Sequence, residues 1–214
     1  VQDPQAAADE LERCVRELGM SGAMINGQTN GMYLDDDRVS ALWERAADLE
    51  VPIYIHPYNP VDIPAMYHDH PELWGPVWSW TVETGNHALR IVFGGVFDRF
   101  PKARLLLGHM GETLPYQLWR FDSRWLISNR QGRRLEHAPS DYFHRNIWCT
   151  TAGVSSDEPL RCALDALGAD RVMFSIDYPY ESTEEAGEWI EAAPLSEEEK
   201  AKVCYQNAKD LLRL

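Results

Sequence analysis

The chain has 214 residues, of which 44% are hydrophobic and 25% charged, a composition typical of a folded globular protein rather than a disordered or collagen-like chain. Lys and Arg total 20 against 34 Asp and Glu, so the formal net charge is −14, which argues against nucleic acid as a partner. No apolar run approaches the roughly 18 residues of a membrane span, and the four cysteines lack Cys-x-x-Cys spacing, so we expect a cytoplasmic protein that does not bind membranes.

The predicted elements alternate between strand and helix along the chain. Asp3 and Pro4 are typical of a helix start, and apolar residues then recur at helical spacing as far as Gly19. Apolar strands are predicted at about residues 22–26, 51–56, 103–109, 146–151 and 171–177. Helices are predicted at about 39–49, 77–93, 114–129 and 160–167, and a closing helix follows the capping box of Ser196 and Glu199.

This alternation indicates an α/β fold with a parallel sheet that is buried on both faces. An open doubly wound sheet and a (β/α)₈ barrel both satisfy the pattern. The strand ends favour the barrel, because polar residues gather there and a barrel brings all strand ends to one central site. We therefore expect residues 1–214 to form a single TIM-type barrel domain that lacks its N-terminal part and has about five of the eight βα units.

Three residues at predicted strand ends are candidate metal ligands. His56 ends an apolar strand before Pro57, His109 ends the next strand in LLLGHMGE, and Asp177 ends the last strand in FSIDYP. Each residue alone admits a structural role, as a core histidine or as a buried carboxylate with a partner. Together, imidazole and carboxylate groups on one barrel face suit Zn²⁺ or Mn²⁺, although three groups are too few to complete a site.

Four segments then occur in a characteristic order: VPIYIHPYNP, LLLGHMGETLPYQLWRFD, NIWCTTAG and DRVMFSIDYPYES. They resemble the amidohydrolase-superfamily aromatic decarboxylases related to aminocarboxymuconate-semialdehyde decarboxylase. The similarity runs over all 214 residues and is greatest to the branch that acts on γ-resorcylate, 2,3-dihydroxybenzoate and 5-carboxyvanillate. In that family a Glu-x-His or His-x-His pair on the first strand completes the metal site. This chain has no equivalent pair, so the resemblance implies that it begins after the third strand of the family fold.

The resemblance also implies roles for individual residues. It makes His56 a metal ligand, and Asp177 both a ligand and the acid that protonates the substrate ring. His109 becomes a group that acts in catalysis directly or beside the ligands. Glu112 would accept a hydrogen bond from His109 and fix its tautomer, although its position also fits an acid in the first turn of a helix.

Two further residues are candidates for substrate binding. The family pattern directs Arg120 at the substrate carboxylate, whereas without the family Arg120 is a surface arginine. Asn26, at the end of the first predicted strand, is either a partner for a substrate oxygen or a turn residue.

The activity implied is metal-dependent, non-oxidative decarboxylation of a small hydroxylated aromatic carboxylic acid, with Zn²⁺ or Mn²⁺, by a homo-oligomer (dimer or tetramer) when the protein is full length. One alternative is a metal-dependent hydrolase or hydratase of lactonase type, and a second is a truncated, inactive chain with an open barrel. The segment HMGETLPYQLWR resembles decarboxylases more than lactonases. The substrate stays open, because the loop NGQTNGMYLDDD resembles the 5-carboxyvanillate type and GHMGETLPYQLWR the resorcylate type.

Overall fold

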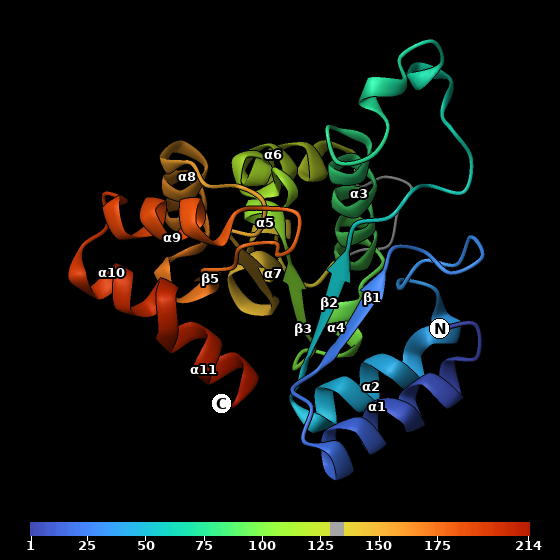
Figure 1. Cartoon of the computed structure of the whole chain (residues 1–214). Coiled ribbons are helices and arrows are strands. Elements are labelled where there is room, and N and C mark those ends of the chain that lie inside the picture. Colours follow the sequence, from blue (N-terminus) through green and yellow to red (C-terminus); the bar gives the residue numbers. More distant parts are fainter. Residues whose placement is uncertain (129–134) are drawn as a thin grey trace.

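The structure is a computed structural model that describes residues 1–128 and 135–214. Across this part of the chain, five parallel strands form one sheet in which the strand order follows the chain order. The strands are β1 (Ala23–Asn26), β2 (Pro52–His56), β3 (Arg104–Leu107), β4 (Ile147–Thr150) and β5 (Val172–Met173). A doubly wound sheet reverses its strand order at a switch point, whereas a (β/α)₈ barrel does not. The predicted α/β class and partial barrel are therefore confirmed (Figure 1).

Helices connect the strands and cover the sheet. The α-helical segments are α1 (Pro4–Leu18), α2 (Ser40–Leu49), α3 (Ser79–Phe93), α4 (Val96–Arg99), α5 (His109–Glu112), α6 (Leu118–Ser128), α7 (Pro139–Asn146), α8 (Asp157–Leu167), α9 (Thr183–Ala192), α10 (Glu197–Ala201) and α11 (Asn207–Leu212). Short 3₁₀ turns are η1 (Asp37–Val39), η2 (Ala65–Tyr67), η3 (Pro71–Leu73), η4 (Leu114–Gln117) and η5 (Ala169–Arg171), and η6 (Lys202–Gln206) is a π-helical turn. The helices predicted from the sequence correspond to α1, α2, α3, η4 with α6, α8, and the closing segment α10 to α11. Residue 129, the predicted end of one helix, lies outside the described residues.

Both faces of the sheet are apolar, which explains the nearly continuous apolar strands. Ile53, Leu105 and Ile147 belong to the main core, together with side chains from the surrounding helices. On the opposite face, Leu106 packs with Met173 of β5 and with Leu211 of α11. Side chains of successive residues on a strand point to opposite faces, so a strand buried on both sides loses the usual polar alternation.

Two strands end earlier than the sequence predicts. β3 ends at Leu107, so His109 lies in the turn α5, and β5 ends at Met173 rather than at Asp177. Beyond Met173, the Thr151 hydroxyl takes the place of backbone hydrogen bonds between the strands. It donates to the Ser175 carbonyl (2.7 Å) and accepts from the Ser175 amide (2.9 Å). The predicted positions of His109 and Asp177 as the last strand residues are therefore wrong, and both residues lie just beyond their strands.

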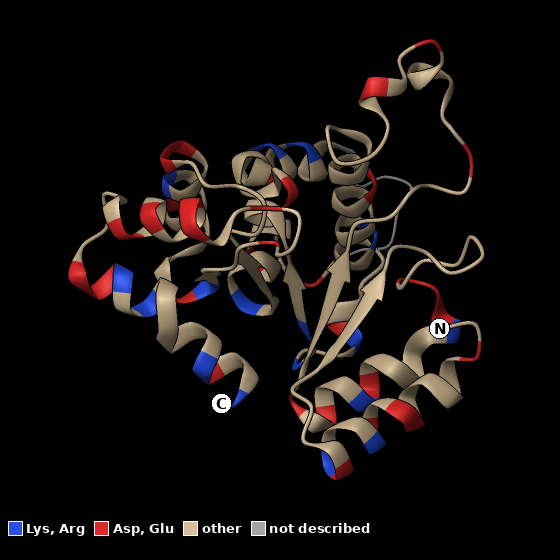
Figure 2. Ribbon diagram, viewed as in Figure 1, with Lys and Arg blue, Asp and Glu red and all other residues tan. Residues whose placement is uncertain are grey.

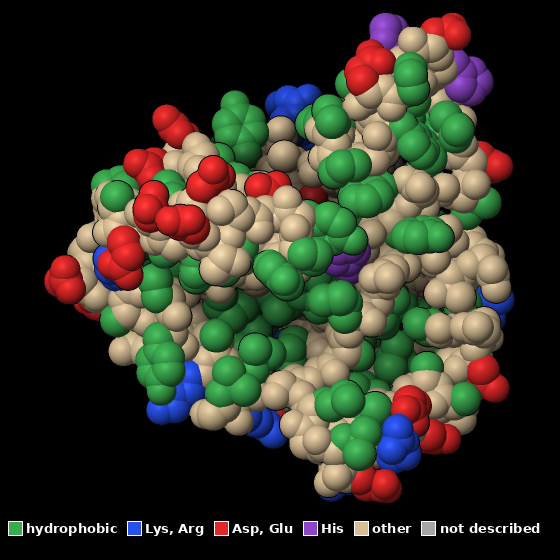
Figure 3. Space-filling view, viewed as in Figure 1, with side chains coloured by type: hydrophobic (Ala, Val, Ile, Leu, Met, Phe, Trp, Pro, Cys, Tyr) green, Lys and Arg blue, Asp and Glu red, His purple; other side chains and the backbone are tan. Residues whose placement is uncertain are grey.

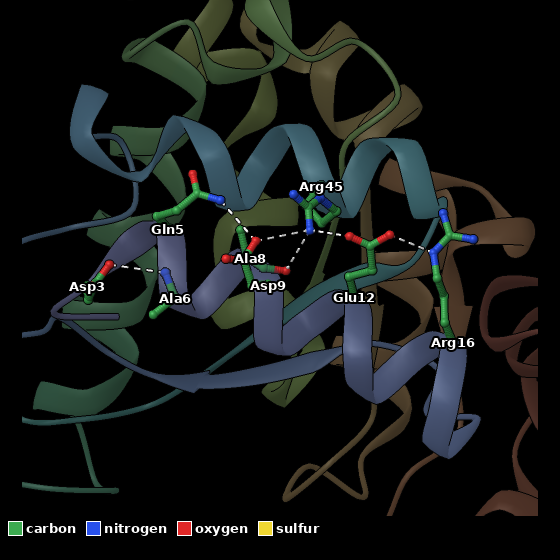
Figure 4. A network of polar contacts seen from close by, with 8 residues as sticks. All are labelled: Asp3, Gln5, Ala6, Ala8, Asp9, Glu12, Arg16 and Arg45. Carbon is green, nitrogen blue, oxygen red and sulfur yellow. Dashed lines mark hydrogen bonds and ion pairs between the residues drawn. The ribbon is translucent and has the colours of Figure 1, made fainter.

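Helices α1 and α2 pack against each other through a polar network (Figure 4). The Asp3 side chain caps α1 by accepting from the Ala6 amide at 3.1 Å, as the Asp-Pro start predicts. Arg45 of α2 forms ion pairs with Asp9 (3.5 Å) and Glu12 of α1 and donates to the Ala8 carbonyl at 3.4 Å. One guanidinium thus ties the two helices along their shared face.

Acidic side chains are concentrated on α9 and α10 (Figure 2). Both helices carry glutamates in their first turns, where the helix dipole favours negative charge, and Ser196 and Glu199 form the predicted capping box. Within the described residues no helix is both long enough and apolar enough to cross a membrane.

Candidate active site

A cavity of about 510 Å³ lies where the carboxyl ends of the strands meet. Its lining combines aromatic, apolar and ionisable groups: His56, Pro57, Pro76, Trp80, Thr81, His109, Glu112, Gly153, Val154, Asp177, Tyr180 and Glu181. A histidine side chain is visible near the middle of the space-filling view, with hydrophobic side chains around it (Figure 3). The structure therefore brings His56, His109, Glu112 and Asp177 to one cavity, while their chemical roles stay predictions.

His56 occupies the last position of β2 and reaches the cavity with a defined tautomer. Its Nδ1 lies 3.0 Å from the carbonyl oxygen of Pro57. A carbonyl oxygen only accepts, so Nδ1 donates its proton to it, and in the neutral ring Nε2 then carries the lone pair. This tautomer leaves Nε2 able to bind a cation, since a metal-binding histidine usually donates its other N–H to such an acceptor.

His109 and Glu112 lie on the short turn α5, whose backbone is left-handed. His109 (φ 47°), Met110 (54°), Glu112 (54°) and Thr113 (63°) all have positive φ, as does Gly111 (73°). Glu112 Oε1 lies 2.7 Å from His109 Nδ1, so the hydrogen bond predicted between these residues is present. Glu112 also lies in the first turn of the four-residue segment α5, as the alternative interpretation has it, but Met110 and Gly111 within that segment have non-helical backbone angles.

The electrostatic setting of His109 favours its protonated form. Burial tends to lower the pKa of His109, but the hydrogen bond and charge of Glu112, together with the charge of Asp177, outweigh it and raise that pKa above its usual value. Glu112 is 1% exposed, so its carboxylate acts on the imidazole with little screening by water.

Asp177 faces His109 across a glycine. Its Oδ2 lies 3.6 Å from His109 Nε2, within ion-pair range but too far for a hydrogen bond. Gly153, with φ of 68°, lies against both side chains: a Cβ there would be 3.0 Å from His109 Cδ2 and 3.2 Å from Asp177 Oδ2. Only glycine fits this position without strain, so Gly153 allows the two side chains to approach each other.

The ionisable groups of the cavity have the right chemistry to bind a divalent cation, but they are too few to complete its coordination. His56 Nε2 and the Asp177 carboxylate are the nitrogen and oxygen donors that Zn²⁺ and Mn²⁺ accept. Among the described residues, no group of three or more His, Cys, Asp or Glu side chains is placed to hold a metal ion. A cation held by His56 and Asp177 would therefore need further donors, such as substrate oxygens or water.

Two predicted substrate-binding residues lie outside this cavity. Asn26 is aligned with His56 across the β1–β2 ladder, but it is exposed and lines a separate, more open hollow of about 730 Å³. Arg120 is exposed on α6 and is not among the residues that line the cavity. The structure does not bring either residue to the cavity with His56, and their roles stay predictions.

The cavity also contains residues that the sequence reading missed. Gly153 follows β4 and Tyr180 follows β5 by a few residues, so the rule that loops after barrel strands form the site could have identified them. That rule does not identify Trp80 and Thr81. They lie in the first turn of α3, which follows a long loop that extends away from the sheet (Figure 1). Trp80 Nε1 donates to Asn59 Oδ1 at 2.7 Å, which fixes the indole in the cavity wall.

Comparisons with known proteins identify the family of the chain. The sequence model of the family described as "Amidohydrolase" matches residues 1–214. A γ-resorcylate decarboxylase from Polaromonas sp. (strain JS666) is 41% identical over 223 residues, which cover 100% of this chain and 68% of that protein. The chain thus spans about two thirds of the length of this relative.

Solved structures show the same similarity. A dihydroxybenzoic acid decarboxylase from Polaromonas sp. JS666, with bound manganese and the inhibitor 2-nitroresorcinol, matches with a TM-score of 0.92 and 39% identity over 100% of this chain and 67% of that chain. A 5-carboxyvanillate decarboxylase from Sphingomonas paucimobilis matches with a TM-score of 0.94 and 37% identity over 100% of this chain and 64% of that chain.

Proposed function

Because the chain belongs to the amidohydrolase family, we propose that it catalyses the metal-dependent, non-oxidative decarboxylation of a hydroxybenzoate-type acid. The observation that carries this proposal is the convergence of His56, His109, Glu112 and Asp177 on one cavity. Its volume of about 510 Å³ is in the usual range for small-molecule sites and accommodates a single substituted benzene ring. The similar proteins named as decarboxylases of γ-resorcylate and 5-carboxyvanillate support the substrate class.

The cavity wall suits an aromatic acid. Trp80, Pro57 and Val154 offer apolar surface for the ring, and Asn59 holds the Trp80 indole in place. The acids named for the similar proteins each carry a hydroxyl group ortho to a carboxylate. We therefore propose an ortho-hydroxybenzoate as the substrate, with its polar edge toward His56 and Asp177.

A divalent ion, manganese in the similar Polaromonas enzyme, would be held by His56 Nε2 and Asp177 and would supply positive charge to the substrate carboxylate and ortho oxygen. Zn²⁺ and Mn²⁺ both suit these donors. The ion would compensate part of the negative charge that Glu112, Asp177 and Glu181 contribute to the cavity.

Proton delivery falls to Asp177. Asp177 takes up a proton from His109, 3.6 Å away, and gives it to the ring carbon that bears the carboxylate. The bond between that carbon and the carboxylate then breaks, its electron pair restores the aromatic ring, and CO₂ leaves. The hydrogen bond and charge of Glu112 raise the pKa of His109, which favours the protonated imidazole that supplies this proton, and His109 takes a new proton from water for the next turnover.

The direct test measures CO₂ release by the purified protein with Mn²⁺ or Zn²⁺ from γ-resorcylate, 2,3-dihydroxybenzoate, salicylate and 5-carboxyvanillate. We expect at least one acid to react, and Asp177→Asn to lower the rate by about 10²–10⁴-fold, the usual contribution of a general acid. Asp165→Asn is the matched control, because Asp165 is an exposed carboxylate on α8 that pairs with Arg161 outside the cavity.

Metal binding is measured in parallel by calorimetry, with His56→Ala as the variant that loses a ligand. Opening of a lactone without CO₂ release from any acid would establish the hydrolase alternative instead. If neither Mn²⁺ nor Zn²⁺ binds and no acid reacts, the chain matches the inactive alternative, in which the cavity has too few donors.

We also propose that the protein assembles as a homo-oligomer and works in the cytoplasm. Val77 (70% exposed) and Trp78 (46% exposed) offer an apolar contact beside the cavity. The four cysteines are free thiols, as expected in a reducing compartment. Light scattering coupled to size-exclusion chromatography tests the assembly, and Val77→Asp should shift it toward the monomer.

A further inference from the structure

The turn that carries His109 is held in an unfavourable backbone conformation. Five consecutive residues from His109 to Thr113 have φ between 47° and 73°, and four of them carry a Cβ. For such residues the left-handed region brings Cβ close to the backbone carbonyl, so single residues visit it and runs are rare. A run of this kind persists only where surrounding contacts hold it.

The Glu112 side chain makes the contacts that can hold this turn. It is buried, and each of its two carboxylate oxygens has a different partner. Oε1 lies 2.7 Å from His109 Nδ1, within the turn, and Oε2 accepts from the Thr81 hydroxyl at 2.9 Å. Thr81 belongs to the first turn of α3, so its hydrogen bond ties the left-handed turn to a long helix of the scaffold.

We propose that Thr81 is a positioning residue, whose hydroxyl holds Glu112 and, through it, the left-handed turn that directs His109 toward Asp177. Without this bond Glu112 would keep only its partner inside the turn, and the carboxylate could rotate together with the imidazole. A hydrogen bond from a neutral hydroxyl to an ionised carboxylate is stronger than one between neutral groups, which suits it to this task. The effect on catalysis rests on the proposed decarboxylation, whereas the effect on the turn does not.

Helix α3 provides a matched control one turn further along. Thr84 is 0% exposed, and its hydroxyl has no hydrogen-bonding partner among the described residues. Thr81→Val and Thr84→Val are the same isosteric change on the same helix, and only the first removes a hydrogen bond to Glu112. Thr81→Ser keeps the hydroxyl and should rescue the effect.

The first measurement is amide hydrogen exchange at Gly111 and Thr113. Both amides donate within the turn, Gly111 to the Gly108 carbonyl at 2.7 Å and Thr113 to the Gly111 carbonyl. We expect Thr81→Val to speed their exchange about tenfold, the effect of losing one hydrogen bond to a charged group. Thr81→Ser and Thr84→Val should leave exchange at these two amides unchanged.

The second measurement follows the His109 ring by ¹⁵N NMR at neutral pH, with the signals assigned by comparison with His109→Gln. Thr81→Val should reduce the fraction of His109 whose Nδ1 is hydrogen-bonded to Glu112. In the decarboxylation assay, the same variant should lower kcat about tenfold with little change in KM, because the substrate is still bound while the imidazole is misplaced.

Equal exchange rates and equal ring signals in Thr81→Val and Thr84→Val would overturn the proposal. A rise in KM with unchanged kcat would overturn it too, because it would make Thr81 a substrate contact. If no acid reacts at all, the proposed function fails, but the exchange and NMR results still decide the role of Thr81. Should Thr81→Val not fold, Glu112→Gln disturbs the same bond from its other side, and the proposal then requires faster exchange at Gly111 and Thr113.

Discussion

Gly153 illustrates how a single residue sets the spacing of the cavity. It has φ of 68°, and a Cβ there would approach His109 and Asp177 within 3.0 and 3.2 Å. Alanine would therefore strain the backbone and push apart the two side chains that face each other. A side chain at this position is therefore strained, although the position lies outside the described strands and helices.

We predict that Gly153→Ala destabilises the protein by about 1–2 kcal/mol and lowers the decarboxylation rate more than tenfold. Thermal unfolding and the CO₂ assay measure the two effects. Gly187→Ala is the control, because a Cβ at that position in α9 meets no atom within 4 Å. A Gly153→Ala variant with parental activity would show that the spacing of His109 and Asp177 is not critical.

Glu83 is a buried carboxyl that takes no part in the proposed reaction. Burial raises the pKa of Glu83 to about 7, with a smaller opposing effect of the Tyr33 hydroxyl and an added rise from the charge of Glu112. The folded state therefore keeps the Glu83 proton up to about pH 7, whereas the unfolded chain releases it near pH 4.5. Its contribution to stability is complete below pH 4.5 and is lost as the pH rises to 7.

We predict that Glu83→Gln stabilises the protein at pH 8 relative to the parent, by up to about 3 kcal/mol, and has little effect at pH 4.5. Urea unfolding at the two pH values measures the difference. An equal change in the free energy of unfolding at both pH values would contradict the assigned titration.

At the scale of elements, the segment before α2 is held between two helices through the backbone of Leu34. The Leu34 amide donates to His87 Nε2 of α3 at 2.9 Å, and the Leu34 carbonyl accepts from Trp43 Nε1 of α2 at 2.7 Å. His87 and Trp43 are both 0% exposed. The contact thus joins α2 and α3 through the backbone of a single residue and requires a neutral imidazole.

This requirement predicts acid sensitivity. Burial lowers the pKa of His87 to about 3, with a further lowering from the Arg90 charge, whereas histidine in the unfolded chain titrates near pH 6.5. Below pH 6.5 the unfolded state gains a proton that the folded state does not accept, so stability falls as the pH drops from 6.5 toward 3. The loss from this residue reaches at most about 5 kcal/mol.

His87→Gln tests this account, because a glutamine oxygen can still accept from the Leu34 amide but does not titrate. We expect a shallower decline of the unfolding free energy between pH 6.5 and 4 in this variant. His144→Gln is the control, because His144 bonds the Ala166 carbonyl at an exposed position. Parallel declines in His87→Gln and the parent would contradict the assignment.

At the scale of the whole molecule, the sheet has two free edges. Within the described residues β1 pairs only with β2, and β5 pairs only with β4. A free edge presents unpaired amide and carbonyl groups that can add a strand from another chain. The β1 edge is also partly apolar, since Met24 is 64% exposed.

We therefore predict that the 214-residue chain associates as its concentration rises, and that Met24→Lys reduces this association several-fold, because a charge on an edge strand opposes pairing. Sedimentation velocity over a range of concentrations measures the change. Met20→Lys, at a similarly exposed site before β1, is the control and should have little effect. Equal effects of the two lysines would attribute the association to general hydrophobicity.

The match between sequence and structure is best where structure depends on neighbouring residues. Asp3, Gly19 and the Ser196–Glu199 box mark helix ends in the sequence and in the structure, because capping bonds span only a few residues. The apolar strands were also predictable, since a strand covered on both faces carries few polar residues. The shortened β5 was not, because the Thr151 hydroxyl that replaces its ladder comes from another segment.

The residue types and the alternation of strands and helices were therefore enough to predict the fold class. They were also enough to predict that His56, His109 and Asp177 lie at the same end of the sheet. Tertiary structure alone decided which other groups contact these residues. It places the Thr81 hydroxyl against Glu112 and Gly153 against His109. It leaves Asn26 and Arg120 outside the cavity. The reason is physical. Local patterns determine the conformation of a segment, whereas distances between side chains depend on how segments far apart in the chain pack together.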